Sequence, residues 1–401
     1  MQIILKPHAI ESEDTVRVAI LHTRLNILGG GERVCLAIIR TLKERYGATV
    51  DLYSLDKLKW QEVERKFGKE WVMQVNEYPM ARTETLVPVF SIYQRLILST
   101  VSKLVSKIRS AKKHYDLVIN TIGDFNLGVS DITYMHYPFE TLDINSKYRN
   151  SNLWKLYSFP YTVYQNHNIK ENIKKTYLLC NSLFTMKTCE SVYGRFNGEV
   201  VYPPVDNKNF AELRDIPFMH RNKSVITISR LSQEKRLETI MKIASQLPDV
   251  VFHIVGGTSA QYTNTLLLIK QLASSSPNVS LHFDASNKEI LELLSQCRLY
   301  LHTMIQEHFG ISIVEAMHSG LPVIVHRSGG QYTDVIDCDR YGMSYTDDQE
   351  VINHIVNTIN DETVWERYHQ MSIERSKNFT FDIFKKNMVR VIDKVIQNKN
   401  N

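Results

Sequence analysis

The sequence predicts an α/β protein with two domains, each built around a parallel sheet. Apolar runs of strand length alternate with helical patterns along the whole chain, which is typical of βαβ units. The length of 401 residues exceeds that of one ordinary domain. Hydrophobic residues make up 43% and charged residues 23% of the chain, so apolar side chains are plentiful enough for two cores.

The first half opens with a buried strand, expected over Val16–His22. A loop follows as far as Gly31, after which apolar residues recur at helical spacing. A later strand begins at Ile132 and ends at His136, which places an imidazole at the carboxyl edge of the sheet. The apolar helical positions are Val34, Ala37, Ile38 and Leu42.

The second half repeats the pattern after an extended connection at Pro203 and Pro204, which lack backbone donors. We therefore expect an acceptor-side domain over 1–205, a second domain over 206–378, and a helix over 379–401 whose apolar face packs back on the first domain. The strands expected in the second domain are Ser224–Ser229, Val250–Gly256, Leu299–Thr303 and Pro322–His326.

The charge distribution points to anionic partners for the first half. Residues 1–200 carry 27 Lys and Arg against 20 Asp and Glu, whereas residues 201–401 carry 21 against 23. This asymmetry is too mild for a nucleic-acid binder but suits a surface that faces anionic lipid or diphosphate. Nucleic acid is therefore not expected as a partner.

Cysteine usage and hydropathy favour a reducing compartment. The five cysteines are an odd number without a Cys-x-x-Cys pair, so neither a disulfide framework nor a zinc site is indicated. The N-terminal apolar run is broken by Lys6 and Pro7 and does not resemble a signal peptide. No stretch reaches 18 apolar residues. We expect a cytoplasmic protein whose membrane contact, if present, is peripheral.

A glycine cluster, Gly29 to Gly31, ends the first loop and opens a helix, so that backbone N–H groups are offered to an anion. The dinucleotide pattern G-x-G-x-x-G would require a sixth-position glycine where Val34 stands, which disfavours an NAD-linked dehydrogenase. A tight turn without a ligand is the alternative interpretation. For His136 the alternative is a structural histidine.

Two cations follow the first strand of the second half. Arg230 and Lys235 lie at the carboxyl end of Ser224–Ser229 and early in the next element. A diphosphate requires such permanent cations, Arg through its planar fork and Lys as a point charge. Taken alone, the pair is also compatible with a solvated helix start.

The most specific segment runs from Gln306 to Gly330. Glu307 lies in a loop after a strand, Gly310 permits a close backbone approach, and Ile311–Met317 is expected to be a helix whose first amides point at the loop. Glu315, eight residues after Glu307, falls just over two turns into that helix. A carboxylate there can accept two hydrogen bonds from a ribose diol while the helix start takes phosphates.

These motifs resemble the donor signature of the retaining family 4 glycosyltransferases, including its Glu-x7-Glu motif. The resemblance covers nearly the whole chain and implies the GT-B fold, in which two Rossmann-like βαβ domains face each other across a cleft. In the first half, further motifs are similar to those of the α-1,2-mannosyltransferases that extend dolichol-linked oligosaccharides from GDP-mannose. The first-half motifs are Gly29–Val34, Tyr134–Pro138 and Val200–Asp206.

The resemblance implies a role for each donor-side residue. Arg230 and Lys235 would bind the donor diphosphate and Glu315 the ribose. Glu307, together with nearby backbone amides, would bind the transferring sugar and phosphate. Charge that grows on the leaving diphosphate would be stabilised by these cations and amides. The amides are those of Phe309, Gly310 and Ile311.

In the first domain, Gly30 and Gly31 would line the cleft and His136 would contact the sugar. The expected partners are a nucleotide-sugar donor and a glycan, or a glycan linked to polyprenyl or dolichyl diphosphate. No metal or other cofactor is expected. Asp337 and Asp339 spell the Asp-x-Asp by which other glycosyltransferases hold a cation, but they do not follow a nucleotide-binding strand and are interpreted as a loop.

Two rival functions stay open. A GT-B fold alone does not determine the reaction, so a sugar-nucleotide epimerase or a phosphorylase is an alternative. An inactive carbohydrate-binding subunit is another, although the retention of the four donor residues argues against it.

A basic stretch in the first half supplies a hypothesis about membranes. Residues 85–115 contain no acidic side chain, and their apolar residues recur at helical spacing. Such a helix can lie in an anionic lipid interface, or it can cover the first domain's sheet with its lysines solvated. The basic residues of this stretch are Arg95, Lys103, Lys107, Arg109, Lys112 and Lys113.

Overall fold

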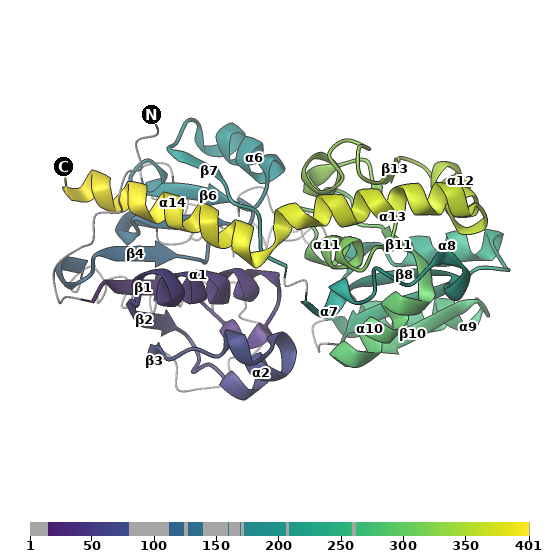
Figure 1. The fold of residues 1–401 in the computed structure, drawn as a ribbon, viewed down its shortest axis with the longest axis horizontal. Coiled ribbons are helices and arrows are strands. Elements are labelled where there is room, and N and C mark those ends of the chain that lie inside the picture. The colour runs from purple at the N-terminus through teal and green to yellow at the C-terminus, as the bar shows by residue number, and fades with distance from the viewer. Residues whose placement is uncertain are drawn as a thin grey trace, which may run out of the picture.

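The computed structural model describes residues 15–79, 112–123, 127–138, 159, 169, 172–205, 208–258 and 262–400. Two parallel sheets with helices around them lie side by side along the long axis of the molecule (Figure 1). The predicted fold class, two Rossmann-like domains with parallel sheets, is confirmed.

The first sheet has seven described strands in the order β3-β2-β1-β4-β5-β6-β7, and each neighbouring pair is parallel. The chain builds outward from β1 to β3 and then crosses back to β4, so the strand order reverses between β1 and β4. The strands are β1 (Arg17–Leu21), β2 (Thr49–Ser54), β3 (Asn76–Pro79), β4 (Leu117–Asn120), β5 (Ile132–Met135), β6 (Tyr177–Cys180) and β7 (Gly198–Val200).

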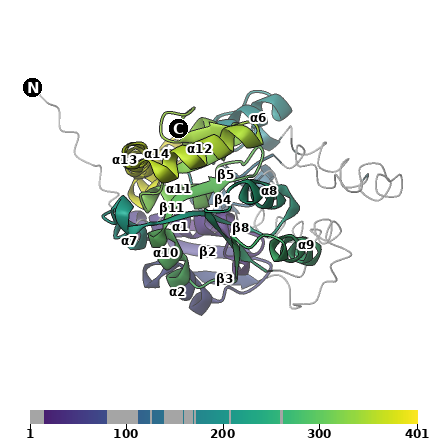
Figure 2. The ribbon, with the colours of Figure 1, turned by 90° about the vertical axis from the view of Figure 1, so that its right-hand side faces the viewer.

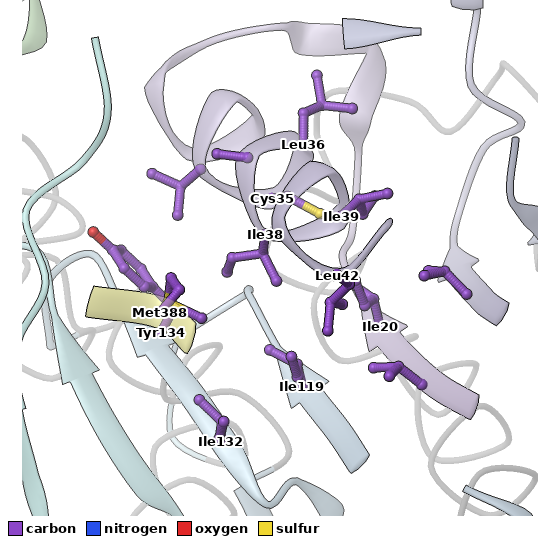
Figure 3. Packing of buried hydrophobic residues seen from close by; sticks show 14 of the residues in the cluster. Ile20, Cys35, Leu36, Ile38, Ile39, Leu42, Ile119, Ile132, Tyr134 and Met388 are labelled. Atoms are coloured by element: carbon purple, nitrogen blue, oxygen red, sulfur yellow. The ribbon is translucent and has the colours of Figure 1, made fainter. Parts of the chain in front are cut away.

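Helix α1 (Gly30–Tyr46) is the main cover of this sheet. Its apolar positions Val34, Ala37, Ile38 and Leu42 are fully buried, as the helical spacing predicts. Figure 3 shows Ile38 and Leu42 packed toward Ile20, Ile119 and Ile132 of the strands. The other described α-helices of this half are α2 (Trp60–Phe67) and α6 (Leu183–Tyr193).

The second sheet has six described strands in the order β10-β9-β8-β11-β12-β13, again all parallel. Its order reverses between β8 and β11, which repeats the design of the first sheet. The strands are β8 (Asn222–Arg230), β9 (Val251–Gly257), β10 (Val279–Phe283), β11 (Cys297–His302), β12 (Val323–His326) and β13 (Met343–Tyr345).

Helices surround this second sheet, as the end-on view shows (Figure 2). The predicted helix over Ile311–Met317 is present as α11 (Ile311–His318). The others are α7 (Lys208–Ala211), α8 (Glu238–Gln246), α9 (Thr263–Ser274), α10 (Asn287–Gln296), α12 (Asp348–Asn360) and α13 (Glu362–Ser376).

The chain crosses between the domains twice. The first crossing runs through Val201–Val205, and the second leads from α13 into the last helix, α14 (Phe381–Asn400), which returns along α1 (Figure 1). The two crossings touch, because the amide of Val205 donates to the carbonyl of Phe379 at 2.7 Å. The buried face of α14 that joins the first core consists of Phe381, Phe384, Met388, Val391, Ile392 and Val395.

A further contact between the domains caps a helix. Asp334 of the second domain accepts hydrogen bonds from the first amides of α6, those of Leu183 at 2.5 Å and Phe184 at 3.2 Å. A carboxylate at a helix N-terminus satisfies donors that have no partner within the helix. Asp334 therefore ties the amino end of α6 to the second domain.

Most of the basic stretch 85–115 lies outside the described residues, which include only Lys112–Tyr115 of it. Among the helices that the structure describes, none combines the length and the apolar character needed to span a bilayer.

Candidate active site

The predicted site residues gather at the carboxyl ends of strands near the two points where strand order reverses. Parallel sheets bind ligands at such points, because the loops on either side lead away from each other. Arg230 is the last residue of β8 and His302 the last residue of β11. His136 directly follows β5, which ends at Met135.

Glu307 is the centre of a buried polar cluster. One carboxylate oxygen, Oε2, accepts hydrogen bonds from Lys235 Nζ at 2.5 Å and from His302 Nε2 at 3.1 Å. The other oxygen, Oε1, accepts the backbone amide of His308 at 3.0 Å. The side chains of Lys235 and Glu307 are 11% and 13% exposed, so this ion pair is largely removed from solvent.

The charges in this cluster are fixed by their contacts. Burial alone would raise the pKa of Glu307, but Lys235 and His302 outweigh it and hold that pKa well below its ordinary value. Burial lowers the pKa of His302, so this imidazole is neutral and donates from Nε2 to the carboxylate. Glu307 is thus an ionised carboxylate with partners on both oxygens.

The backbone places Lys235 beside the strand ends. It is the last residue of a short 3₁₀ turn, Gln233–Lys235, and its carbonyl accepts the hydroxyl of Thr303 at 2.6 Å. Its Nζ also lies 3.2 Å from the sulfur of Met304. The segments after β8 and β11 therefore hold each other in register around Glu307.

Arg230 lies at the rim of the site. Its side chain is 64% exposed, lies 3.6 Å from the carboxylate of Glu234, and donates to the hydroxyl of Tyr262 at 3.3 Å. No hydrogen bond joins it to Glu307 among the described residues. The structure thus brings Lys235 to Glu307 but leaves Arg230 toward solvent.

The three residues after His308 contribute to the site through their backbone amides more than through their side chains. Phe309 is 2% exposed and stacks on Tyr202, so its ring belongs to the core. Gly310 precedes α11 at φ +100°, a conformation that favours glycine, and a Cβ there would collide with Ile313. The amino end of α11, which starts at Ile311, therefore faces the loop of Glu307.

Glu315 is paired with the opposite domain. Its Oε1 accepts a hydrogen bond from Arg33 Nη2 at 2.7 Å, and the two side chains are 15% and 16% exposed. Arg33 belongs to α1, so this contact joins α1 to α11. The predicted ribose carboxylate is thus held by a cation 282 residues away in sequence.

The glycines at the start of α1 are close to the other site elements. A Cβ on Gly30 would lie 2.8 Å from Cδ1 of Ile311, and one on Gly31 would lie 3.4 Å from Nε2 of His136. Gly30 therefore lacks room for a side chain unless Ile311 shifts, whereas a Cβ on Gly31 would make an ordinary van der Waals contact with the ring of His136. The structure brings Gly30 to the donor-side helix and Gly31 to His136.

His136 is part of a histidine network under the glycine turn. Its Nε2 lies 3.3 Å from the carbonyl of Thr121, which can only accept, so Nε2 carries the proton. Burial, with the charge of His22 nearby, lowers the pKa of His136 to about 4. His136 is therefore neutral near pH 7, and its Nδ1 is the acceptor.

His22 in the same network has the opposite charge preference. Its Nε2 lies 3.5 Å from Glu32, whose other oxygen accepts the amide of Gly29 at 2.7 Å. Burial alone would lower the pKa of His22, but contacts with Cys35 and Glu32 raise it to about 10. The His22–Glu32 pair thus anchors the turn that opens α1.

An aromatic stack also connects the domains at the site. The ring of Tyr137 lies 3.8 Å from that of His308, with an interplanar angle of 5°. Burial, together with the charge of Lys235, lowers the pKa of His308 to about 4, although the Glu307 carboxylate acts to raise it. This neutral imidazole occupies the junction between the His136 region and the Glu307 loop.

Asp337 and Asp339 lie apart from this cluster. They flank Cys338 in a turn where all three residues have positive φ, and Asp337 lies 3.7 Å from Arg340. Within the described ranges, no group of three or more His, Cys, Asp or Glu side chains could hold a metal ion.

The sequence analysis assigns no role to several side chains of the site, among them His22, Glu32, Arg33, Tyr137, His302 and His308. His302 lies near the end of the predicted strand Leu299–Thr303, so its position was a usable signal. The partner of Arg33 lies in another domain, and no local pattern connects the two residues.

Comparisons with known proteins identify the second domain and the overall fold. Residues 209–377 match the family model described as glycosyl transferases group 1. A Dictyostelium discoideum relative named GDP-Man:Man(3)GlcNAc(2)-PP-Dol alpha-1,2-mannosyltransferase is 23% identical, over 85% of this chain and 77% of its own length. The Xenopus laevis protein of the same name is 26% identical, over 80% and 74%.

Solved structures show the same fold. A sucrose-phosphate synthase from Thermosynechococcus elongatus superposes with a TM-score of 0.73 at 16% identity, over 95% of this chain and 99% of that one. Anabaena HepE in complex with UDP and glucose gives 0.69 at 18%, over 94% and 99%. These likenesses show the GT-B fold, and residues 209–377 form a glycosyl transferases group 1 domain, which together with the mannosyltransferase relatives makes the chain a glycosyltransferase.

Proposed function

We propose that this glycosyltransferase transfers mannose from GDP-mannose to a lipid-linked glycan, as a retaining enzyme of family 4. The observation that carries the proposal is the buried Glu307–Lys235–His302 cluster beside the amino end of α11. The donor is assigned as GDP-mannose because relatives along most of the chain are named for it.

The basic and the acidic residues on the donor side have different roles. Charge grows on the diphosphate as the bond to the sugar breaks, and Arg230, Lys235 and the first amides of α11 are placed to stabilise it. Glu315 takes the ribose hydroxyls. Glu307, fixed as a carboxylate by Lys235, accepts hydrogen bonds from the transferring sugar.

The first domain supplies the opposite wall. Gly30 and Gly31 let the start of α1 approach the sugar and phosphate closely. The neutral ring of His136 offers Nδ1 as an acceptor for a sugar hydroxyl. We assign no metal to the reaction, since fixed cations and helix amides carry the charge that a metal would otherwise balance.

A transfer assay tests the assignment. The protein is incubated with radiolabelled GDP-mannose and a synthetic lipid-diphosphate trimannosyl acceptor, with UDP-glucose as the competing donor. We expect an elongated glycan from GDP-mannose whose new linkage is α by NMR, with the full rate in excess EDTA. Hydrolysis without an elongated product would contradict transferase activity, and rescue of an EDTA-inhibited rate by Mn²⁺ would contradict metal independence.

We also propose peripheral binding to the cytoplasmic face of a membrane through the basic stretch 85–115. It rests on sequence alone, because a basic amphipathic segment binds anionic lipid and salt screens the attraction. We expect cosedimentation with anionic but not neutral liposomes, weakened by salt. The triple change of Lys103, Lys107 and Lys112 to Glu should release the protein. Wild-type protein that stays in the supernatant at low salt would contradict the proposal.

A further inference from the structure

Helices α1 and α11 meet through two adjacent pairs of residues. Gly30 faces Ile311, and Arg33 faces Glu315. Arg33 follows Gly30 by three residues and Glu315 follows Ile311 by four, so each pair lies on one face of its helix. The guanidinium of Arg33 is thus directed at the surface where the proposed donor binds.

The charges on the donor side leave the diphosphate short of cations. A sugar-linked diphosphate is a dianion. In the second domain Lys235 is already paired with Glu307, and the exposed Arg230 lies beside Glu234. Glu315 adds a further negative charge, which Arg33 balances, and Lys66 is a second first-domain cation near this pair.

The guanidinium of Arg33 has a donor left over. Nη2 is used by Glu315, whereas Nη1 is buried and makes no hydrogen bond within the described part of the chain. A buried charged donor without a partner is costly, and a planar fork matches phosphate oxygens. The ring of Phe67, centred 5.3 Å from Cζ, supports the group from the side.

We propose that Arg33 is a donor-binding residue supplied by the first domain, and that its guanidinium contacts the diphosphate while Glu315 accepts the ribose hydroxyls. The inference rests on the proposed function, because it assumes a nucleoside-diphosphate sugar at this site. The ribose replaces one hydrogen bond that Glu315 now receives from Arg33, and the diphosphate gives the guanidinium new acceptors. When the donor binds, its ribose and diphosphate thus replace the hydrogen bond that now joins Glu315 to Arg33.

The test compares GDP with guanosine, which lacks the phosphates. Both are titrated against a fluorescent GDP analogue bound to wild-type protein and to Arg33→Met, a neutral side chain of similar length. We expect Arg33→Met to bind GDP about tenfold more weakly or worse, since a hydrogen bond to a charged group is lost, and guanosine within about twofold of wild type. Arg45→Met removes a charge from the exposed last turn of α1 and should change neither affinity.

Other outcomes overturn the inference. If Arg33→Met binds both GDP and guanosine more tightly, Arg33 only competes with the ribose for Glu315. If it binds both more weakly by the same factor, Arg33 only positions Glu315. If Arg33→Met does not fold, Arg33→Lys is used instead, because lysine keeps the charge but lacks the planar guanidinium. A GDP affinity equal to that of wild type would then overturn the proposed guanidinium contact. A loss of affinity for GDP but not for guanosine would support it. Wild-type protein that binds no GDP would contradict the proposed function itself.

Discussion

Glu307 and Glu315, the two carboxylates of the Glu-x7-Glu motif, are held in different ways. Glu307 is fixed within its own domain, by Lys235, His302 and the amide of His308. Glu315 is held from the opposite domain, by Arg33 alone among the hydrogen bonds that the described residues make to its carboxylate. The partners of Glu307 thus belong to its own domain, whereas the partner of Glu315 belongs to the other domain.

This difference suggests a division of labour. Catalytic groups work best when their surroundings are fixed before the reaction begins, and the Glu307 cluster meets that condition. A carboxylate whose partner comes from another domain responds instead to whatever enters between the domains. We therefore expect substitutions at Glu307 to act on turnover and those at Glu315 to act on donor affinity and domain contact.

The largest expected effect comes from Glu307→Gln. The substitution removes the negative charge but keeps the shape, and leaves Lys235 without its counterion. We expect kcat for mannose transfer to fall about 100-fold, with GDP affinity changed by less than about threefold. Steady-state rates with GDP-mannose and calorimetric titration of GDP check this. The exposed Glu292→Gln is the matched control, and loss of affinity at an unchanged kcat would reverse the division of labour.

A double-mutant cycle on Arg33 and Glu315 tests the contact between the domains. Each single substitution, Arg33→Met or Glu315→Gln, leaves a largely buried partner unpaired and should lower the free energy of unfolding by about 2 to 3 kcal/mol. The double mutant should lose less than both combined, with a coupling energy of about 1 to 2 kcal/mol. Urea unfolding of the four proteins measures it. Additive losses would show that the pair contributes nothing as a pair.

The neighbouring contact between Gly30 and Ile311 predicts a smaller effect, which a second substitution should reverse. Gly30→Ala places a methyl group 2.8 Å from Cδ1 of Ile311, which must shift. We expect a loss of about 1 kcal/mol in stability and a few-fold weaker donor binding. Ile311→Val removes that Cδ1 atom, so adding it to Gly30→Ala should restore most of both. If the double mutant is no better than Gly30→Ala, the close approach of the two helices is not the cause.

The smallest effect is expected from mild acidification. Burial lowers the pKa values of His136 and His308 to about 4, so kcat/KM should show no step near pH 6.5 attributable to them. For stability, the comparison is with the unfolded chain. Between pH 6.5 and 4 these two imidazoles are protonated in the unfolded chain but stay neutral in the folded protein. Their contribution is therefore present above about pH 6.5 and is lost as the pH falls toward 4. A rate step near pH 6.5 that disappears in His308→Gln would contradict the shift at His308.

The fold was accessible from sequence because its signals are local. Buried strands such as β1 and β12 consist mostly of short apolar runs, and the apolar residues of α1 recur at helical spacing on its core face. The connection between the domains is likewise visible in the sequence, because Pro203 and Pro204 favour an extended chain.

The site was only half accessible, for a physical reason. Lys235 and Glu307 both follow strands of one sheet, and the carboxyl ends of neighbouring parallel strands β8 and β11 meet at one edge. Arg33 and Tyr137 acquire their roles only when the domains come together, through contacts with Glu315 and His308. Such contacts depend on how two folded units dock, and no spacing along the chain encodes that.

The two crossings between the domains have a mechanical consequence. They are joined by the hydrogen bond from Val205 to Phe379, so both connections between the domains pass through one place. A pair of joined connections permits rotation about that point and resists sliding. We expect a rotation there to change the Arg33–Glu315 distance, whereas the contacts of Glu307 with Lys235 and His302, which lie within one domain, should stay together. A single angle of rotation would then set how far apart the two walls of the site stand.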